Sequence, residues 1–325
     1  MLRRGLVLAH RWAGIALAIF LIPVSLTGSV LAWGPVIDSW INPTLHFVAS
    51  RESLSEAELV ARVRAAKPGI RVAGVDLPSA PGRSARVVVG GWIDPADAEH
   101  RINEAFVDPA TGLLLGARST TTPRFSRLEL LAWLKRFHYT LMLKRTGMVL
   151  MGIVAIAWLL DAFVGALLTL PKTLARWRKW HIAWKVKGSR LSYDLHRAGG
   201  LWLWPVLVVM AASSVYLNLG HEVFVPGVEF IAARLLPESV RLGVTETILE
   251  WQQPLHTGQA FGLAGPFIVS LAGLSVAALA ITGLRTAWRK LVPATASRPS
   301  SSSSDRAPSA VPARASAHRR SPRSA

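Results

Sequence analysis

The sequence predicts an α-helical membrane protein in which four transmembrane helices form two repeated helix pairs. A small α+β domain is expected outside the membrane, between helices one and two. Three observations favour this fold class. Hydrophobic residues make up 51% of the 325 residues, and the mean hydropathy of +0.35 is too high for an ordinary soluble domain. Four windows reach the roughly 20 apolar residues that a helix needs to cross a bilayer. A short histidine motif also occurs twice, in matching places.

The apolar windows carry almost no charge. Three of them have none, and the second contains a single carboxylate, Asp161. The windows lie at 13–33, 147–170, 198–219 and 260–284. We expect the corresponding transmembrane helices within residues 1–34, 146–171, 197–219 and 260–285.

Charges that flank the windows predict how the chain is oriented. The net charge is +18, and much of it lies beside the windows, so it does not indicate nucleic-acid binding. The segment 172–196 is strongly basic, whereas 220–259 leans acidic. By the positive-inside rule, both termini and the basic segment face the cytoplasm, and 35–145 and 220–259 lie outside. The segment 35–145 also contains many arginines, but long loops cross the membrane largely regardless of charge.

The first outer segment is long enough to hold a folded unit. Residues 54–69 have the pattern of a short amphipathic helix, with Ser55 as its N-cap and acidic residues in its first turn. Three β-rich stretches follow, at 71–77, 85–92 and 102–108. The turn "DPATG" then leads into the apolar stretch "LLLGAR". The connection 220–259 is predicted as a loop, and the Ser-, Pro-, Ala- and Arg-rich tail 293–325 as disordered.

The chain contains no cysteine. This excludes disulfides, cysteine-ligated iron–sulfur clusters, thiolate zinc sites and haem attached through C-x-x-C-H. Any haem would therefore be b-type, held without covalent bonds. No Walker A or G-x-G-x-x-G motif occurs in a supporting context. A reductase with this sequence would take its electrons from a membrane pool or a partner protein.

Histidine motifs recur at matching places in the two halves of the chain. "HRWAG" at 10–14 matches "HRAGG" at 196–200, each at the start of a helix predicted to run outward. "LAWLKRFH" at 131–138 matches "LEWQQPLH" at 249–256, each before a helix predicted to run inward. Glycines follow the second motif at the same two spacings in both halves: Gly147 and Gly165 in the first half, Gly265 and Gly283 in the second. We interpret the four helices as two copies of one pair, whose small residues allow helices or a flat ligand to approach closely.

The predicted orientation sorts these histidines into two pairs. His10 and His196 lie at cytoplasmic helix ends, and His138 and His256 lie near outer helix ends. Two facing imidazoles can bind one iron atom from opposite sides, so each pair is a candidate set of axial ligands for a haem b, two haems in all. A haem at each face would form an electron route across the bilayer. Three arginines are candidate partners of haem propionates: Arg11, Arg197 and Arg136.

Other interpretations of the polar residues stay open. A histidine at a helix end can be an ordinary interfacial polar group. His46 and His221 also lie just outside predicted helices and could replace an outer ligand, although neither has a counterpart in the other half. The remaining histidines are predicted to be solvated: His100, His181 and His318. Asp161 could relay a proton or contact a quinol, or it could pair with an arginine or another helix.

Longer segments carry a resemblance to a known family. "LAHRWAGIALAIFLIPVSLTGSVLAW", "DLHRAGGLW" and "LHTGQAFGLAGPFIVSLAGL" resemble the PepSY-associated transmembrane family. The outer "LSEAELVARVRAAKPG … FVDPATGLLLG" is similar to a PepSY module. The resemblance covers about residues 6–290 and implies a bacterial inner-membrane protein with a periplasmic PepSY-like domain at 35–145. One departure lies in the third helix, where Ser214 stands as far from His196 as Gly28 stands from His10 in the first helix.

The resemblance further implies two b-type haems, held by the four repeated histidines, and one-electron transfer to ferric chelates. We therefore expect a haem-dependent ferric siderophore reductase, in which the cytoplasmic pair accepts an electron and the outer pair delivers it. The expected partners are membrane lipid, a quinol or redox protein as donor, and a ferric siderophore or other chelate as acceptor. The competing hypothesis is a non-enzymatic membrane module that binds or regulates a periplasmic partner.

Overall fold

A computed structural model describes residues 1–50, 52–170 and 180–291. Four helical stretches in these residues are long and apolar enough to cross a membrane, so the expectation of a multi-pass membrane protein is confirmed. Four long helices form the bundle: α1 (Leu2–Leu31), α6 (Lys144–Thr169), α9 (Trp204–Leu219) and α12 (Gly265–Leu291). The tail 293–325 and the basic residues between 171 and 179 lie outside the described residues.

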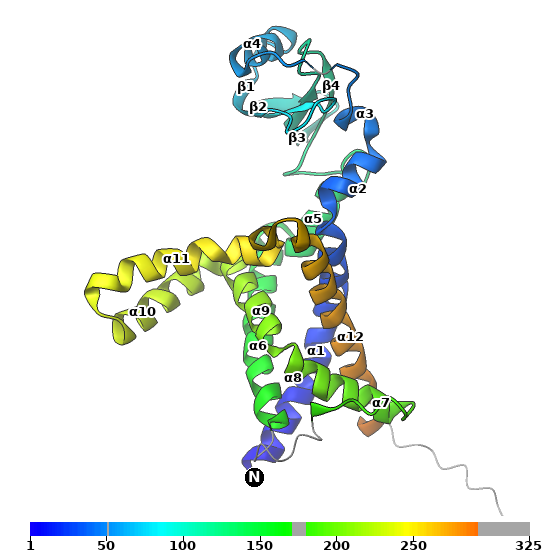
Figure 1. Ribbon diagram of the computed structural model, residues 1–325, viewed down its shortest axis with the longest axis vertical. Coiled ribbons are helices and arrows are strands. Elements are labelled where there is room, and N and C mark those ends of the chain that lie inside the picture. The colour runs from blue at the N-terminus through cyan, green and yellow to red at the C-terminus, as the bar shows by residue number, and fades with distance from the viewer. Residues whose placement is uncertain (51, 171–179, 292–325) are drawn as a thin grey trace, which may run out of the picture.

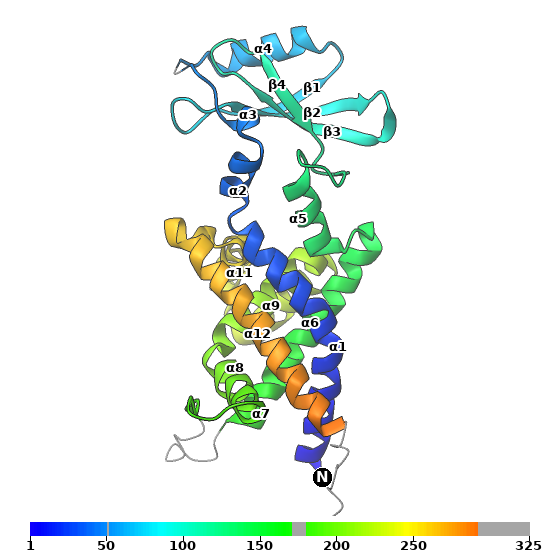
Figure 2. The ribbon, with the colours of Figure 1, turned by 90° about the vertical axis from the view of Figure 1, so that its right-hand side faces the viewer.

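The bundle has two different ends (Figure 1). The N-terminus and the last turn of α12 lie at one of them, which we call the terminal end. A small β-sheet domain stands beyond the other, which we call the sheet end. Helix α1 packs against both α6 and α12, and α6 packs against α9, whereas α9 and α12 make few contacts. Figure 2 shows α1 and α12 crossing in front of the other two long helices.

Small polar residues bring α1 and α12 close together. Ser29 donates a hydrogen bond to the carbonyl of Ser270 (3.1 Å), and Ser270 donates one back to the carbonyl of Ser29 (2.9 Å). The indole N–H of Trp33 donates to the Ser270 hydroxyl (2.9 Å). A Cβ added at Gly273 would collide with the Ser29 side chain. Close backbone approach and hydrogen bonds of this kind stabilise helix pairs in lipid.

The third span departs from the single helix expected at 197–219. It begins as a π-helical turn, η2 (Leu195–Gly199), which follows α7 (Ser189–Asp194) and continues into the short α8 (Gly200–Trp202). Helix α9 then starts afresh at Trp204. The break has a local cause, because Pro205 in the first turn of α9 has no N–H to donate to the preceding turn.

The sheet domain agrees with the α+β prediction. Four antiparallel strands pair in sequence order: β1 (Arg71–Asp76), β2 (Ala85–Asp94), β3 (Asp97–Val107) and β4 (Leu114–Arg118). Helix α4 (Glu56–Ala66) covers one face and buries Leu59 and Val63 against the strands. Ser55 caps α4 through a reciprocal hydrogen-bonded box with Glu58, as its sequence predicts. The predicted turn at 108–112 is also present, since Gly112 donates its N–H to the Asp108 carbonyl (2.8 Å).

Three short helices join the sheet domain to the bundle: α2 (Gly34–Ile41), α3 (Pro43–His46) and α5 (Leu130–Thr140). A buried carboxylate, Asp38 on α2, accepts hydrogen bonds from Arg118 on β4 (2.7 Å) and from His46 (2.9 Å). Arg118 also donates to Glu104 on β3 (2.6 Å). Burial would raise the pKa of Asp38, but the hydrogen bonds and the charge of Arg118 outweigh it and lower the pKa from 3.8 to about 2. This ionic joint ties α2 to the sheet.

The connection 220–259, expected as a loop, is helical. A π-helical turn, η3 (Gly220–Phe224), leads from α9 into α10 (Val225–Leu235), and α11 (Glu238–Thr257) returns to the bundle. A short 3-10 turn, η4 (Gln259–Ala264), then leads into α12. Helices α10 and α11 form a hairpin that projects sideways from the sheet-end half of the bundle (Figure 1).

Candidate functional site

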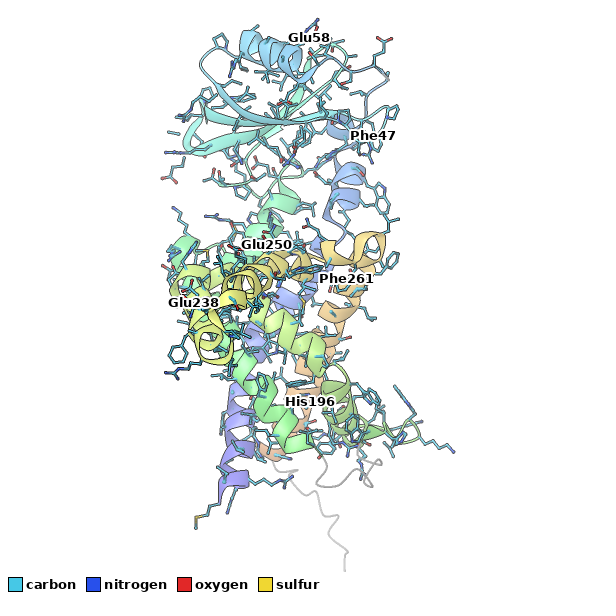
Figure 3. The ribbon with its side chains drawn as sticks, turned by 60° about the vertical axis from the view of Figure 1, so that its left-hand side comes forward. Phe47, Glu58, His196, Glu238, Glu250 and Phe261 are labelled. Atoms are coloured by element: carbon cyan, nitrogen blue, oxygen red, sulfur yellow. The ribbon has the colours of Figure 1, made fainter. Side chains whose placement is uncertain are left out.

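The structure brings together His10 and His196, which belong to different halves of the chain, at the terminal end. The centroids of the two imidazole rings are 6.0 Å apart. His10 lies on α1, and His196 lies in the π-helical turn η2. Figure 3 shows His196 in the half of the bundle away from the sheet domain. Single π turns within α-helices are frequent at functional sites, because the extra residue re-aims a side chain.

Each of these two histidines is fixed through its Nδ1 atom. The Nδ1–H of His10 donates to the Asp161 carboxylate on α6 (2.8 Å), and that of His196 donates to the backbone carbonyl of Leu279 on α12 (2.8 Å). The two acceptors occupy equivalent positions, since Asp161 and Leu279 follow the second histidine of their halves at the same spacing. Of the roles that the sequence left open for Asp161, the structure therefore contains the hydrogen bond between helices.

The second pair, His138 and His256, lies at the sheet end, with ring centroids 6.3 Å apart. Neither histidine stands on a long span. His138 belongs to α5, and His256 belongs to the last turn of α11. Both helices end within three residues of the histidine, at the left-handed residues Leu141 and Gly258, and short connections lead on to α6 and α12.

Hydrogen bonds to α1 and α9 fix this second pair. The Nδ1 atom of His138 lies 3.0 Å from the Val24 carbonyl and 3.1 Å from the Thr27 hydroxyl. The Nδ1 atom of His256 lies 2.9 Å from the Ser213 hydroxyl. Ser213 gives its own proton to a carbonyl one turn back, so the hydroxyl accepts from the histidine. Thr27 and Ser213 again hold equivalent positions, at the same spacing after the first histidine of each half.

These contacts settle which nitrogen of each ring carries the proton. Carboxylates and carbonyls only accept hydrogen bonds, so Nδ1 donates in His10, His138 and His196, and Ser213 leads to the same assignment for His256. In the neutral form of each ring the Nε2 atom then keeps its lone pair, and it has no hydrogen-bond partner among the residues that the structure describes. A histidine held through Nδ1–H with a free Nε2 is the form that ligates metals.

Glycines make room for three of the four rings. A Cβ added at Gly165 would lie 3.2 Å from Cε1 of His10, and one added at Gly283 would lie 2.8 Å from Cε1 of His196. A Cβ at Gly28 would lie 2.9 Å from Cε1 of His138. These spacings were predicted to admit a neighbouring helix or a flat ligand. The structure assigns them to the imidazole rings themselves.

The other repeated glycines shape the turns before the long spans. A Cβ added at Gly147 would collide with the carbonyl of Thr140, and one added at Gly265 would collide with the carbonyl of Gly258. Both clashes occur where the chain folds back after the second histidine of its half. The Gly in the first motif differs, because a Cβ at Gly14 would meet nothing within 4 Å.

The serine that departs from the glycine pattern also has a defined place. Ser214, the position equivalent to Gly28, donates to the Met210 carbonyl of its own helix (2.7 Å). The neighbouring Ser213 is the residue that holds His256. The fourth ring is thus held by Ser213, the counterpart of Thr27, and not by the serine that stands at the glycine position.

The predicted arginines are in different situations. Arg197 pairs with buried Asp194 (3.3 Å), yet its Nε is buried and has no hydrogen-bond acceptor in the described part of the chain. Arg11 is half-buried and forms no ion pair with any described residue. Arg136 donates to the Tyr139 hydroxyl (2.9 Å). Arg197, adjacent to His196, and Arg11, adjacent to His10, therefore retain free donors beside the terminal-end pair.

The remaining histidines do not join either pair. His46 uses its Nε2 to donate to Asp38 and packs its ring against Phe106 in the sheet domain. His221, in η3, and His181 are exposed. The prediction that His100 is solvated is wrong, because it is buried and donates from Nε2 to the Glu129 carboxylate (2.9 Å). His100 lies on a strand in a polar stretch of sequence, and nothing in that local sequence indicates its contact with Glu129. His318 lies outside the described residues.

Two imidazoles are fewer than the three or four protein ligands that a zinc ion takes. No group of three or more His, Cys, Asp or Glu suited to a metal ion occurs among the described residues. Haem iron needs only axial ligands, because the porphyrin supplies the other four. If one iron bound both Nε2 atoms of a pair, a bond of about 2 Å on each side, plus about 1.2 Å from each nitrogen to its ring centre, would separate the ring centres by about 6.4 Å. The separations of 6.0 and 6.3 Å are close to this spacing.

The two pairs are separated by nearly the thickness of a membrane. Helix α1 contributes His10 to one pair and Thr27 to the support of the other. The helix between these two residues spans about 26 Å at a rise of about 1.5 Å per residue, close to the hydrocarbon core of about 30 Å.

Several supporting residues escaped the sequence prediction: Val24, Thr27, Ser213 and Leu279. Two of them act through backbone carbonyls, which any side chain can accompany, so no residue type marks them. Thr27 and Ser213 did leave a signal. Each is a hydroxyl residue at the same distance along the chain from the histidine of its motif, inside an otherwise apolar span.

Comparison with known proteins gives a match to a protein-family model. No curated protein matches the chain. A family model described as the PepSY-associated TM region matches residues 7–239 and 232–290, which together include both histidine pairs and the sheet domain. The chain therefore belongs to the PepSY-associated transmembrane family.

Proposed function

We propose that this protein carries electrons across a bacterial inner membrane between two b-type haems and reduces a ferric siderophore or another ferric chelate. One observation carries the proposal. Four histidines from matching positions meet as two pairs, with Nδ1 bound to the protein, Nε2 free, and ring separations suited to a shared iron. The four helices would then be two copies of one helix pair, each giving one histidine to each site.

The chain's own residues would bind and orient the cofactor. The hydrogen bonds at Nδ1 hold each imidazole in one tautomer and raise its basicity as a ligand. Gly28, Gly165 and Gly283 leave the rings close against neighbouring helices. Arg197 and Arg11 have donors for carboxylate groups near the terminal-end pair, and apolar helices exclude water. Haem supplies reversible one-electron chemistry when bound.

The orientation is part of the proposal. Both termini would face the cytoplasm, where the terminal-end pair would receive electrons from a quinol or a redox protein. The sheet domain would face the periplasm, where the sheet-end pair would pass electrons to the acceptor. The basic segment after α6 and the acidic balance of 220–259 support this direction.

An optical spectrum of the purified full-length protein tests the proposal. We expect a red protein with a Soret band, a reduced b-type α-band and about two haems per chain, in line with the two histidine pairs. Addition of ferric chelates to the dithionite-reduced protein, after removal of excess dithionite, should re-oxidise it. A colourless protein from haem-replete cells would overturn haem binding and favour a non-enzymatic module. A red protein that no ferric chelate re-oxidises would keep the haems and reject the acceptor.

A further inference from the structure

The hairpin helix α11 exposes a row of apolar side chains to its surroundings. Val240, Val244, Ile248 and Trp251 are 47%, 37%, 38% and 49% exposed. They follow one another at intervals of four, four and three residues, so they share one face of the helix. We call this row the α11 stripe. The described residues leave more than a third of each of these side chains uncovered.

The other faces of α11 differ from the stripe. Glu246, Glu250 and Gln253 are exposed and lie on roughly the opposite side of the helix, beside one exposed apolar residue, Leu242. A third side packs against the protein, where Thr245 is buried and α11 contacts α9 and α10. A soluble hairpin would place polar residues on all of its exposed faces. The segregation in α11 is typical of a helix that lies at an interface between water and an apolar medium.

Helix α10 also exposes apolar side chains. Phe230, Ile231 and Leu235 are more than half exposed, and the guanidinium of Arg234 lies 3.9 Å from the centre of the Phe230 ring. An arginine that covers an aromatic ring keeps its charged end free to reach a polar boundary.

Exposed apolar residues also connect α10 to the lipid-facing surface of α9. Leu217, near the end of α9, and Val223, in the turn η3, are 39% and 41% exposed. They stand between the exposed part of the span and the exposed part of the hairpin. The apolar surface of the hairpin is thus continuous with a surface that lipid already covers in a membrane-spanning helix.

The position of the hairpin agrees with this continuity. Figure 1 shows α10 and α11 beside the sheet-end half of the bundle, running across its long axis and not beyond its end. Figure 3, in which Glu238 and Glu250 mark α11, brings the hairpin toward the viewer. A bilayer that surrounds the four spans would therefore also surround the hairpin, because the hairpin does not extend beyond the sheet end.

We propose that the α10–α11 hairpin lies in the membrane leaflet on the sheet side, with the α11 stripe and the apolar residues of α10 in contact with lipid. Glu246 and Glu250 then face water or head groups. This seating has a consequence for the site, because the last turn of α11 carries His256. Lipid would contact the part of α11 that carries the stripe, and the bundle would contact the last turn, which carries His256. The proposal does not depend on haem binding.

Single cysteines can test the proposal without interference, since the chain contains none of its own. Val244→Cys and Ile248→Cys place a spin label on the stripe. Glu246→Cys and Glu250→Cys place it on the polar face within the same two turns. The labelled full-length proteins are reconstituted into vesicles of phosphatidylethanolamine and phosphatidylglycerol. Collisions with oxygen, which dissolves in lipid, are compared with collisions with a water-soluble nickel chelate.

We expect the ratio of oxygen to nickel collisions to be several-fold higher at 244 and 248 than at 246 and 250. Equal access of nickel to all four labels would overturn the proposal in favour of a hairpin in water. Shielding of 244 and 248 from both reagents, retained at low protein-to-lipid ratio, would overturn it in favour of a contact with protein. Ile231→Cys and Glu229→Cys repeat the comparison on α10, in case a substitution on α11 prevents folding.

Discussion

The two histidine pairs share a geometry and differ in their electrostatics. At the terminal end, His10 donates to a carboxylate, that of Asp161. At the sheet end, His138 and His256 donate to a carbonyl and to neutral hydroxyls. A carboxylate makes the imidazole a stronger electron donor and favours ferric iron, whereas neutral acceptors do so less. If each pair binds a haem, the terminal-end haem has the lower reduction potential. Two sites with the same ligand geometry would then differ in reduction potential, and electron transfer from the terminal end to the sheet end would be energetically favourable.

Removal of one histidine from each pair is the strongest way to break this comparison. His10→Ala and His138→Ala should each lose one of two haems, and about half of the Soret absorbance per chain, because iron with one axial imidazole is held weakly. The double variant should lose both. Exposed His181→Ala is the matched control and should keep two haems. Loss of the same spectral component by both single variants would mean that the histidines are not paired by membrane face.

Added bulk behind a ring should have the next largest effect. Gly28→Ala places a methyl group 2.9 Å from Cε1 of His138, so the ring must shift, at a cost of about 1–3 kcal/mol. We expect partial haem loss and an altered spectrum for the sheet-end site alone. Gly14→Ala on the same helix meets no atom within 4 Å and should leave both sites unchanged. The haem-to-protein ratio after size-exclusion chromatography measures the effect.

Acid should loosen the ionic joint between α2 and the sheet. The pKa of Asp38 falls from 3.8 to about 2 in the folded protein. The joint therefore contributes its stability fully above about pH 4 and loses it as the pH falls toward about 2. The shift corresponds to about 2 kcal/mol. The protection factors of the amides in residues 97–118, corrected for intrinsic exchange rates, should fall over this interval in the wild-type protein. An equal fall in Asp38→Asn, which has no carboxylate to titrate, would rule out this joint as the cause.

The smallest expected effect comes from removing the charge of Asp161, the feature in which the two histidine pairs differ. Asp161→Asn keeps an oxygen acceptor for His10 but removes the charge, so the midpoint potential of the terminal-end haem should rise. A tenfold change in the reduction equilibrium equals about 59 mV for one electron, and we expect a shift of this order. Thr27→Val at the sheet end should shift the potential little, because the Val24 carbonyl still accepts from His138. A spectroscopic redox titration in which Asp161→Asn leaves both potentials unchanged would contradict the electrostatic argument.

The sequence alone was sufficient to predict features that have a local sequence pattern or a pattern that occurs in both halves of the chain. Apolar windows located the spans, Ser55 marked the start of α4, and the repeated spacing selected the four histidines that the fold brings together. The glycine spacings were also visible, but their purpose was not, because only coordinates show that Gly165 faces a ring on another helix.

Other features depend on contacts between distant parts of the chain. Asp161 and His10 lie on different helices in opposite parts of the first half, and no local pattern connects them. The hairpin was predicted as a loop because polar and apolar residues alternate along it without a clear excess of either. The regular spacing of the apolar residues in the α11 stripe was nevertheless present in the sequence. His100 looked exposed because its partner, Glu129, belongs to a segment that reaches it only in the folded domain.

The π-helical turn at Leu195–Gly199 makes the third span sensitive to length. A π turn holds one residue more than an α turn. Deletion of a single residue from this turn would let the segment relax to a regular α-helix. The segments on either side would keep their relative orientation, because the π turn itself accommodates the extra residue. Only the residues inside the turn, His196 among them, would be re-aimed, so a change of one residue in length would disturb the terminal-end pair while the sheet-end pair kept its place.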